Sequence, residues 1–368
     1  MENRFNFQLY KWHLEISTKC ALKCPRCPRT EKPGQYTVGE MSLDFIRETF
    51  TPDFLKTYVK RIILCGGQGD PIYHGKFHDV IRYFKTAHPG LSLQITTNGS
   101  YRSKEWWEEV AGILDEKDIV VFSVDGWDQE SNEKYREGCD FSSIEDAIKV
   151  MSKSLAHIRW TAIAFKFNQD RLEEMSEKAE ALGCDSFTVT LSSLFGSQNS
   201  FYLDENGEDL LEPTKENLRT QWGRHQRVFL GAESKIDVQA PFVELMEERV
   251  GELNSEFKDK YIKPLCLTGM KAMYVDVDGI FYPCSWLSHP FGVRKSKVSG
   301  REIKYNDSLF VKYKSEFDLN LKSIEQVINS SHLGDLVQGW KSADQSFIEC
   351  EQKCLAPWEK FLEQRTSV

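Results

Sequence analysis

The sequence has no long hydrophobic run. No stretch approaches the ~20 consecutive apolar residues that a membrane-spanning helix needs. The opening residues, MENRFNFQLYKWHLEIS, also lack the apolar segment that follows a basic region in a secretory signal peptide. These absences argue against helical membrane proteins and secreted proteins, and they predict a soluble protein that stays in the cytoplasm.

Positive charge is also in short supply. The chain has 47 Lys and Arg residues against 56 Asp and Glu residues, which gives a formal net charge of -9. Such a balance repels polyphosphates from most of the surface unless basic residues cluster locally. A nucleic-acid polymer is therefore a disfavoured partner, whereas a mononucleotide is not excluded.

The first half of the chain alternates β-rich and amphipathic segments. The β-rich segments are residues 12–18, 61–66, 93–99, 119–126, 157–165 and 186–192. Between them lie helical patterns at 42–56, 78–86, 103–114, 143–154 and 169–182. Repeated βα units predict an α/β fold with a parallel sheet and outer helices, as an open partial barrel or a doubly wound sheet.

The alternation ends after residue 192. We expect residues 194–263 to form a connecting region with helices at 216–229 and 241–250. The segment MKAMYVDVDGIFYPC then predicts a β-hairpin that turns at Val277-Asp278-Gly279. Three parts follow: a barrel at 1–193, the connecting region at 194–263 and a C-terminal domain at 264–368.

Four short motifs follow the first four expected strands. They are CALKCPRC (20–27), CGGQGDP (65–71), TNGS (97–100) and SVDG (123–126). The C-terminal ends of parallel strands meet at one edge of a sheet, where such folds place their active sites. We therefore expect these four loops to form one site.

The first motif contains three of the ten cysteines, Cys20, Cys24 and Cys27. In a long cytosolic chain, cysteines indicate metal or redox chemistry rather than disulfides. Structural zinc usually takes four protein ligands. A four-iron cluster held by only three thiolates would keep one iron open for another ligand.

The spacing Cys20-x3-Cys24-x2-Cys27, in a loop after a first strand, closely resembles that of the radical S-adenosylmethionine (SAM) superfamily. The resemblance implies a partial (β/α)6 TIM barrel and a [4Fe-4S] cluster whose open iron chelates SAM. It also implies a one-electron reductant of the flavodoxin or ferredoxin type. The electron breaks a carbon-sulfur bond of SAM, and the resulting 5′-deoxyadenosyl radical abstracts hydrogen from the substrate.

The glycine-rich second loop is similar to the family's Gly-Gly-Glu loop, which contacts the SAM ammonium group. By that resemblance, Gly66, Gly67 and Gln68 bind SAM. Gln68 stands where the family usually has Glu, so either a neutral amide or the nearby Asp70 would make the contact.

The third and fourth loops look like those of the peptide-modifying branch of the superfamily, which also has a Tyr-Arg-x-Gly segment. The resemblance assigns Ser123 and Arg136 to the SAM carboxylate or ribose, and it adds Asn98 and Asp125 to the site. Arginine suits a carboxylate because its planar fork can bond both oxygens. No catalytic acid or base follows from the sequence, although Asp70, Tyr73, His74 and Glu130 are expected near the mouth.

Four further cysteines lie behind the barrel: Cys266, Cys284, Cys350 and Cys354. Their arrangement around a hairpin and a distal helix resembles the twitch domain, a shortened SPASM extension. It implies a second, auxiliary [4Fe-4S] cluster that four thiolates close, with a role in electron transfer or support. A four-cysteine zinc site remains the alternative. The isolated Cys65, Cys139 and Cys184 are expected as small core residues.

These features predict a radical SAM oxidoreductase or maturase-type enzyme. Its substrate would be a peptide or a small molecule such as an aminosugar or a nucleoside-like compound, because fold and cofactor alone do not choose among them. One alternative is a regulatory module that binds SAM and the cluster without turnover. Another is a radical SAM enzyme that modifies nucleotides or nucleic acid.

Overall fold

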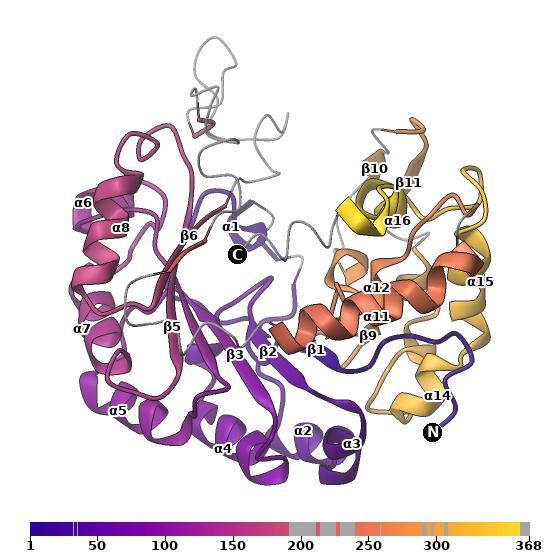
Figure 1. Ribbon diagram of the computed structural model, residues 1–368, viewed down its shortest axis with the longest axis horizontal. Helices are drawn as coiled ribbons and strands as arrows, with labels where there is room; N and C mark the ends of the chain where they lie inside the picture. The colour runs from indigo at the N-terminus through magenta and orange to yellow at the C-terminus, as the bar shows by residue number, and fades with distance from the viewer. Residues whose placement is uncertain are drawn as a thin grey trace.

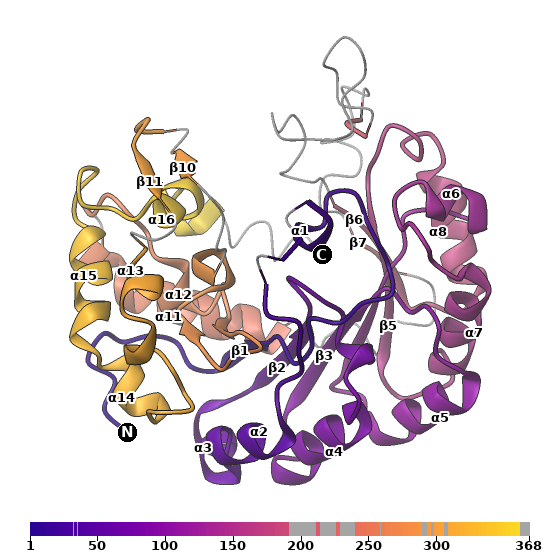
Figure 2. The same cartoon turned by 180° about the vertical axis from the view of Figure 1, so that it is seen from behind.

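The computed structural model describes residues 1–31, 33–34, 36–190, 211–213, 226–228, 240–257, 259–288, 293–295, 298–304 and 308–360. Within these ranges a curved, open sheet carries helices along its outer side. A C-terminal group of helices and short strands lies against one end of the sheet (Figures 1 and 2). The α/β prediction is confirmed.

Six parallel strands form the centre of the sheet, in the order of the chain. They are β1 (Lys11–Leu14), β2 (Arg61–Cys65), β3 (Ser92–Thr97), β4 (Ile119–Ser123), β5 (His157–Ile163) and β6 (Ser186–Thr190). Each neighbour is the next strand in sequence, as repeated right-handed βα units require. All six C-terminal ends therefore lie at the same edge.

Helices between these strands cover the outer face of the sheet (Figure 1). They are α2 (Leu43–Thr49), α3 (Pro52–Tyr58), α4 (Phe77–Ala87), α5 (Lys104–Ile113), α6 (Gln129–Glu133), α7 (Phe141–Met151) and α8 (Leu172–Ala181). In α4 the apolar residues recur at helical spacing, so Phe77, Val80, Ile81 and Phe84 are all buried. The predicted helix periods at 78–86, 103–114, 143–154 and 169–182 are confirmed.

The prediction of one helix over 42–56 is wrong. Two helices occupy the segment, and α3 begins with Thr51 as its N-cap and Pro52 in its first turn. Proline lacks the N–H that a continuous helix would need at that point, and it disfavours helical geometry in the residue before it. The chain therefore ends α2 and starts again.

The sheet continues into the C-terminal part. Strand β8 (Met273–Val275) pairs in parallel with β1, and β9 (Phe281–Tyr282) pairs antiparallel with β8. The hairpin prediction is confirmed, and Gly279 has φ +85°, a left-handed conformation that favours glycine. The sheet thus has the order β7-β6-β5-β4-β3-β2-β1-β8-β9 in the described residues.

Most of the predicted connecting region lies outside the described residues. The helix expected at 216–229 is wrong at Gln226–Val228, which form strand β7 and pair antiparallel with β6. Residues 216–225 and 229 lie outside the described ranges. The helix expected at 241–250 is confirmed within α11 (Ala240–Phe257).

The C-terminal part is built mainly from short helices. They are α12 (Leu265–Thr268), α13 (Leu309–Lys312), α14 (Ile324–Ile328), α15 (Ser331–Gly339) and α16 (Ile348–Cys354), beside a two-stranded ribbon of β10 (Val293–Lys295) and β11 (Glu302–Lys304). The N-terminus joins this part, because the Arg4 backbone N–H donates to the Asn329 side chain at 2.7 Å. No helix in the described residues is long and apolar enough to cross a membrane.

Candidate functional site

A cavity of about 250 Å³ opens at the C-terminal edge of the sheet. Its lining comes from the loops after the first four strands, as the sequence predicts. The lining includes Cys20, Cys24, Cys27, Arg26, Arg29, Gly66, Gly67, Gly69, Asp70, Thr97, Asn98, Ser123, Tyr135 and Arg136. The three cysteines of the first motif therefore share one cavity with five of the seven predicted SAM-binding residues.

The cysteine loop is held by its own hydrogen bonds. The Cys27 N–H donates to the Cys24 carbonyl at 3.1 Å, and Cys27 then precedes the short helix α1 (Pro28–Glu31). The Arg29 guanidinium donates to the carbonyls of Leu22 and Cys20 at 3.3 and 3.2 Å. Arg29 thus fastens the loop around the cavity.

Two thiols of this loop, Cys20 and Cys24, are neutral at neutral pH without a bound cation. Burial raises the pKa of Cys20 to about 12, and the Asp70 carboxylate adds to that rise. Burial also raises the pKa of Cys24 to about 11, against the opposing effect of Arg136. Only a cation that replaces the protons would convert these thiols to thiolates at neutral pH.

The glycine loop after β2 has no room for side chains at two positions. A Cβ on Gly66 would lie 1.8 Å from the Gly69 carbonyl oxygen, and one on Gly69 would lie 2.2 Å from the Ser17 carbonyl oxygen. Both contacts are far inside van der Waals distance. The backbone of this loop therefore packs directly against the end of the first strand and forms one wall of the cavity.

Gln68 borders a different cavity. It lines a second cavity of about 210 Å³, together with Asp276, Asp278, Tyr282 and Lys314. It is not part of the lining of the cysteine cavity. The prediction that Gln68 contacts SAM stays a prediction, and the geometry favours a contact through the loop backbone rather than through the amide.

Asp70 joins the second and third loops. Its carboxylate accepts from the Asn98 backbone N–H at 2.6 Å, from the Asn98 side-chain amide at 2.5 Å and from the Thr97 hydroxyl at 3.1 Å. Burial raises the pKa of Asp70 to about 6 despite these bonds. The Asn98 amide also lies 3.6 Å from the Cys20 sulfur. Asp70 thereby orients Asn98 toward the cysteine loop.

Asp125 and Arg136 form a buried ion pair after β4. The Arg136 Nε donates to Asp125 at 2.6 Å, and the Ile163 backbone N–H donates to the other carboxylate oxygen at 2.6 Å. Burial opposes the charge on Arg136, but Asp125, Cys24 and Tyr135 together outweigh it and raise the Arg136 pKa. Arg136 lines the cavity and Asp125 does not, so Asp125 acts by aiming the guanidinium.

The four C-terminal cysteines are gathered as a second group. Burial raises the pKa of Cys266 well above its usual value, and Cys284 and Cys354 raise it further. The pKa of Cys350 rises through burial and through the other three thiols. Cys266 lies in α12, Cys284 follows β9, and Cys350 and Cys354 lie in α16.

The donor sets fit iron-sulfur clusters. All ten cysteines are free thiols; Cys65 lines the cavity beside the three cysteines of the first motif, and the four C-terminal cysteines form the second group. Among the described residues no three Cys, His, Asp or Glu side chains are close enough to share a single metal ion. A tetrahedral zinc at ~2.3 Å from each sulfur needs sulfurs about 3.8 Å apart. A four-iron cluster binds each thiolate on a different iron and accepts wider spacing.

Two of the proposed catalytic candidates have structural partners. His74 is buried, its Nε2 lies 2.8 Å from the Met41 carbonyl, and its Nδ1 accepts from the Lys76 N–H at 3.0 Å. The Tyr73 hydroxyl donates to the Ser100 carbonyl at 3.1 Å. Glu130 is exposed on α6. None of the three lines the cysteine cavity.

The sequence reasoning missed Glu15 and Tyr274, which lie beneath the glycine loop. The Glu15 carboxylate accepts from the backbone N–H groups of Gln68 and Gly69 and from the Tyr274 hydroxyl. The signal was present, because Glu15 is a charged residue between Leu14 and Ile16 in an otherwise apolar run. Tyr274 had no such signal, since its position depends on the pairing of β8 with β1.

Comparison with known proteins agrees with the cysteine motif. Residues 14–157 match the family model described as the radical SAM superfamily. The chain is also 25% identical over 317 residues to the tungsten-containing aldehyde ferredoxin oxidoreductase cofactor-modifying protein of Pyrococcus furiosus. That alignment covers 83% of this chain and 79% of the relative.

Solved structures share the fold along nearly the whole chain. The structure of anSMEcpe with bound AdoMet (SAM) has a TM-score of 0.52 and 12% identity, and it covers 97% of this chain and 93% of that chain. The S-adenosylmethionine complex of SuiB from Streptococcus suis has a TM-score of 0.50 and 14% identity, over 96% of this chain and 71% of that chain. The prediction of a partial barrel with a C-terminal extension is confirmed.

Proposed function

We propose that the chain is a radical SAM enzyme that couples reductive cleavage of SAM to hydrogen abstraction from a peptide or a small molecule. The observation that carries the proposal is the shared cavity of Cys20, Cys24 and Cys27 with the glycine loop. Three thiols and a row of close backbone groups at one strand edge suit a cluster with one open iron and a ligand beside it.

The residues of the cavity divide the binding of SAM between them. We propose that Cys20, Cys24 and Cys27 hold the SAM-binding [4Fe-4S] cluster, which supplies the electron for cleavage when it is bound. Arg136, aimed by Asp125, would take the SAM carboxylate with its remaining N–H groups. The backbone of the loop that contains Gly66 and Gly67 would face the ammonium group. Ser123 and Asn98 complete the wall.

We further propose that residues 264–368 form a unit with one auxiliary [4Fe-4S] cluster on Cys266, Cys284, Cys350 and Cys354. Four thiols can close such a cluster, so its role would be electron transfer or support rather than direct binding of substrate. Four thiols also suit a zinc ion, so iron, sulfide and zinc analysis decides between the two metals.

The second cavity is our proposed location for a polar part of the substrate. The glycine loop borders both cavities, and the second one is lined by Gln68, Asp276, Asp278 and Lys314. Two names among the comparisons support the two substrate classes. anSMEcpe has been solved with a Cp18Cys peptide, and the Pyrococcus furiosus relative is named for modifying a cofactor.

The test is anaerobic reconstitution followed by reduction with dithionite or a flavodoxin. We expect about eight iron and eight sulfide per chain, little zinc, and SAM-dependent formation of 5′-deoxyadenosine. Candidate substrates should then raise the rate of that formation. Fully loaded protein that forms no 5′-deoxyadenosine with any reductant or substrate would instead support a regulatory module. A content of about four iron and one zinc per chain would show that the four C-terminal cysteines bind zinc instead of an auxiliary cluster.

A further inference from the structure

Glu15 is a carboxylate buried beneath the glycine loop. The residue follows β1 in the chain, between the fully buried Leu14 and Ile16, and it is only 1% exposed. Burying a carboxylate is costly unless its charge is satisfied. The described residues place no Lys or Arg side chain within ion-pair distance of it, so its partners must explain why it is there.

Those partners belong to the loop and to the C-terminal part. One oxygen of Glu15 accepts from the Gln68 N–H at 2.6 Å and from the Gly69 N–H at 3.1 Å. The other accepts from the hydroxyl of Tyr274, which is also buried. That second oxygen lies 3.2 Å from the position of a Cβ on Gly67, so the loop rests directly on the carboxylate.

The orientation of one peptide unit transmits the effect of the Glu15 charge to the opposite face of the loop. In a trans peptide the N–H and the C=O point in opposite directions. Because the Gln68 N–H points at Glu15, the carbonyl of Gly67 points away from Glu15. Gly67 lines the cysteine cavity. A carboxylate bonded to the N–H end also polarises the peptide unit and makes its carbonyl a stronger acceptor.

We infer that Glu15 is a positioning residue for SAM: it fixes the loop of Gly66 to Gly69 and supplies, through the polarised backbone, the negative potential that attracts the SAM ammonium group. The acid stands directly after the first strand instead of in the loop, where Gln68 is neutral and lines the second cavity. This inference rests on the proposed function, since it takes the cysteine cavity as the SAM site.

The charge state of Glu15 gives the inference a pH signature. Burial raises the pKa of Glu15 to about 7, against the hydrogen bonds from Tyr274 and the loop, and Asp276 adds to the rise. The other facing groups are neutral at that pH, because burial lowers the pKa of His13 to about 4 and raises that of Cys65 to about 12. Glu15 therefore carries its charge above about pH 7 and loses it below.

The experiment is titration of SAM into the reconstituted protein between pH 6 and 8.5. Binding is followed by calorimetry and by the electron paramagnetic resonance of the reduced cluster. We expect wild-type affinity to fall as the pH drops through about 7. Glu15→Gln should bind SAM about tenfold more weakly at pH 8, which corresponds to about 1.4 kcal/mol, and should show no such pH dependence.

Tyr274→Phe provides the second variant and keeps the test decisive if Glu15→Gln does not fold. It removes a hydrogen bond that lowers the pKa of Glu15, so the midpoint of the pH profile should move upward. Tyr83→Phe is the matched control, because its hydroxyl donates to the Phe50 carbonyl at 2.7 Å and the residue lines neither cavity. That variant should bind SAM with the wild-type pH profile.

The outcomes separate the two proposals. Wild-type protein that is loaded with iron and binds no SAM at any pH contradicts the proposed function. Wild-type protein that binds SAM, with Glu15→Gln equal to it in affinity and pH profile, overturns the role of Glu15. An unchanged midpoint in Tyr274→Phe does the same. If Glu15→Gln binds SAM more weakly than the wild type by the same factor at every pH, the role of Glu15 is purely structural. That result also overturns the inference.

Discussion

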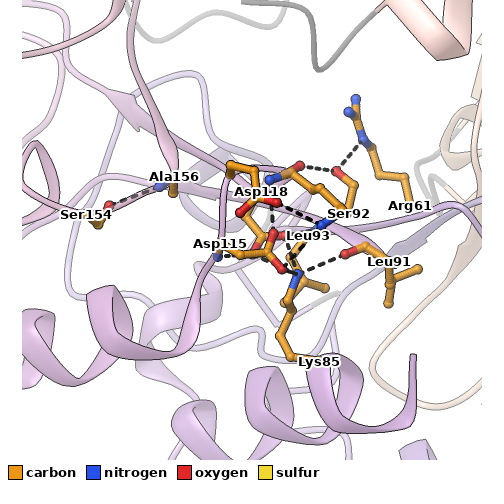
Figure 3. Close-up of polar contacts among 11 residues, drawn as sticks. Arg61, Lys85, Leu91, Ser92, Leu93, Asp115, Asp118, Ser154 and Ala156 are labelled. Atoms are coloured by element: carbon orange, nitrogen blue, oxygen red, sulfur yellow. Dashed lines mark hydrogen bonds and ion pairs between the residues drawn. The ribbon is translucent and has the colours of Figure 1, made fainter. Parts of the chain in front are cut away.

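The two edges of the central sheet differ in how they bury most of their carboxylates. At the N-terminal edge, Asp118 lies beside Lys85 in a closed network (Figure 3). At the C-terminal edge Asp125 pairs with Arg136, but Glu15, Asp70 and Asp276 accept hydrogen bonds only from neutral groups of the described residues. The same side-chain chemistry is thus used once for stability and once for a site.

The N-terminal network leaves no oxygen of Asp118 without a donor. One oxygen accepts from the Leu93 N–H at 2.7 Å, the other from the Asp115 N–H at 2.8 Å, and Lys85 lies within 3.1 Å of both. Lys85 also pairs with Asp115 at 2.8 Å and donates to the Leu91 carbonyl (Figure 3). The network ties α4 to the starts of β3 and β4.

At the C-terminal edge, Asp70 and Asp276 have no cationic hydrogen-bond partner among the described residues. Burial raises the pKa of Asp70 and of Asp276 to about 6, because neutral donors offset only part of the cost of burial. Both side chains border a cavity. Perturbed acids beside cavities are typical of functional sites, so the difference between the edges marks where this fold keeps its chemistry.

The largest expected effect is that of removing a cysteine from the C-terminal edge. Cys27→Ala should reduce the iron content of the reconstituted protein from about eight to about four per chain and abolish formation of 5′-deoxyadenosine. The matched control is Cys184→Ala, because Cys184 is a buried thiol outside both cysteine groups. Equal iron in the two variants would contradict the assignment of Cys27 as a ligand.

The next effect should appear at the N-terminal edge. Asp118→Asn removes the charge that Lys85 faces inside the protein, and Asp115 compensates for only part of the loss. We expect the free energy of unfolding to fall by about 3 kcal/mol, the low end for a broken buried ion pair. Urea denaturation measures this loss. SAM affinity of the folded variant should equal that of the wild type, and a matching loss of affinity would erase the contrast between the edges.

A smaller effect, of opposite sign, is expected for Asp276→Asn. Its raised pKa means that the native state binds a proton more tightly than the unfolded state, so the acid lowers wild-type stability as pH rises from about 4 to 6. Asparagine does not titrate. Relative to wild type, the variant should therefore gain about 1 to 2 kcal/mol between pH 4 and 7.

Unfolding at the two pH values measures this gain. The prediction fails if the difference in free energy of unfolding between Asp276→Asn and the wild type is the same at both pH values. Burial also raises the pKa of Asp118, against the charge of Lys85, so Asp118→Asn should gain stability with the same sign between the two pH values in addition to its overall loss.

Local patterns predicted much of this molecule. Alternating β-rich and amphipathic segments gave the six central strands and most helices, and the spacing of Cys20, Cys24 and Cys27 led to the site. The exceptions depend on contacts between distant residues. Gln226–Val228 is a strand because β6 offers it an edge, and Glu15 matters because the loop at Gln68 and Gly69 folds back onto it. Neither contact produces a periodic pattern of apolar residues that could be recognised in the sequence.

The pairing of β8 with β1 protects the barrel from aggregation. Without β8, the outer edge of β1 would expose a row of unpaired backbone N–H and C=O groups. A strand of another chain could pair with that edge. Here Trp12 and its neighbours on β1 are covered by Met273–Val275, and the two-residue strand β9 is a short edge beyond them. A barrel shortened before residue 264 should therefore self-associate, so the C-terminal part cannot simply be trimmed away.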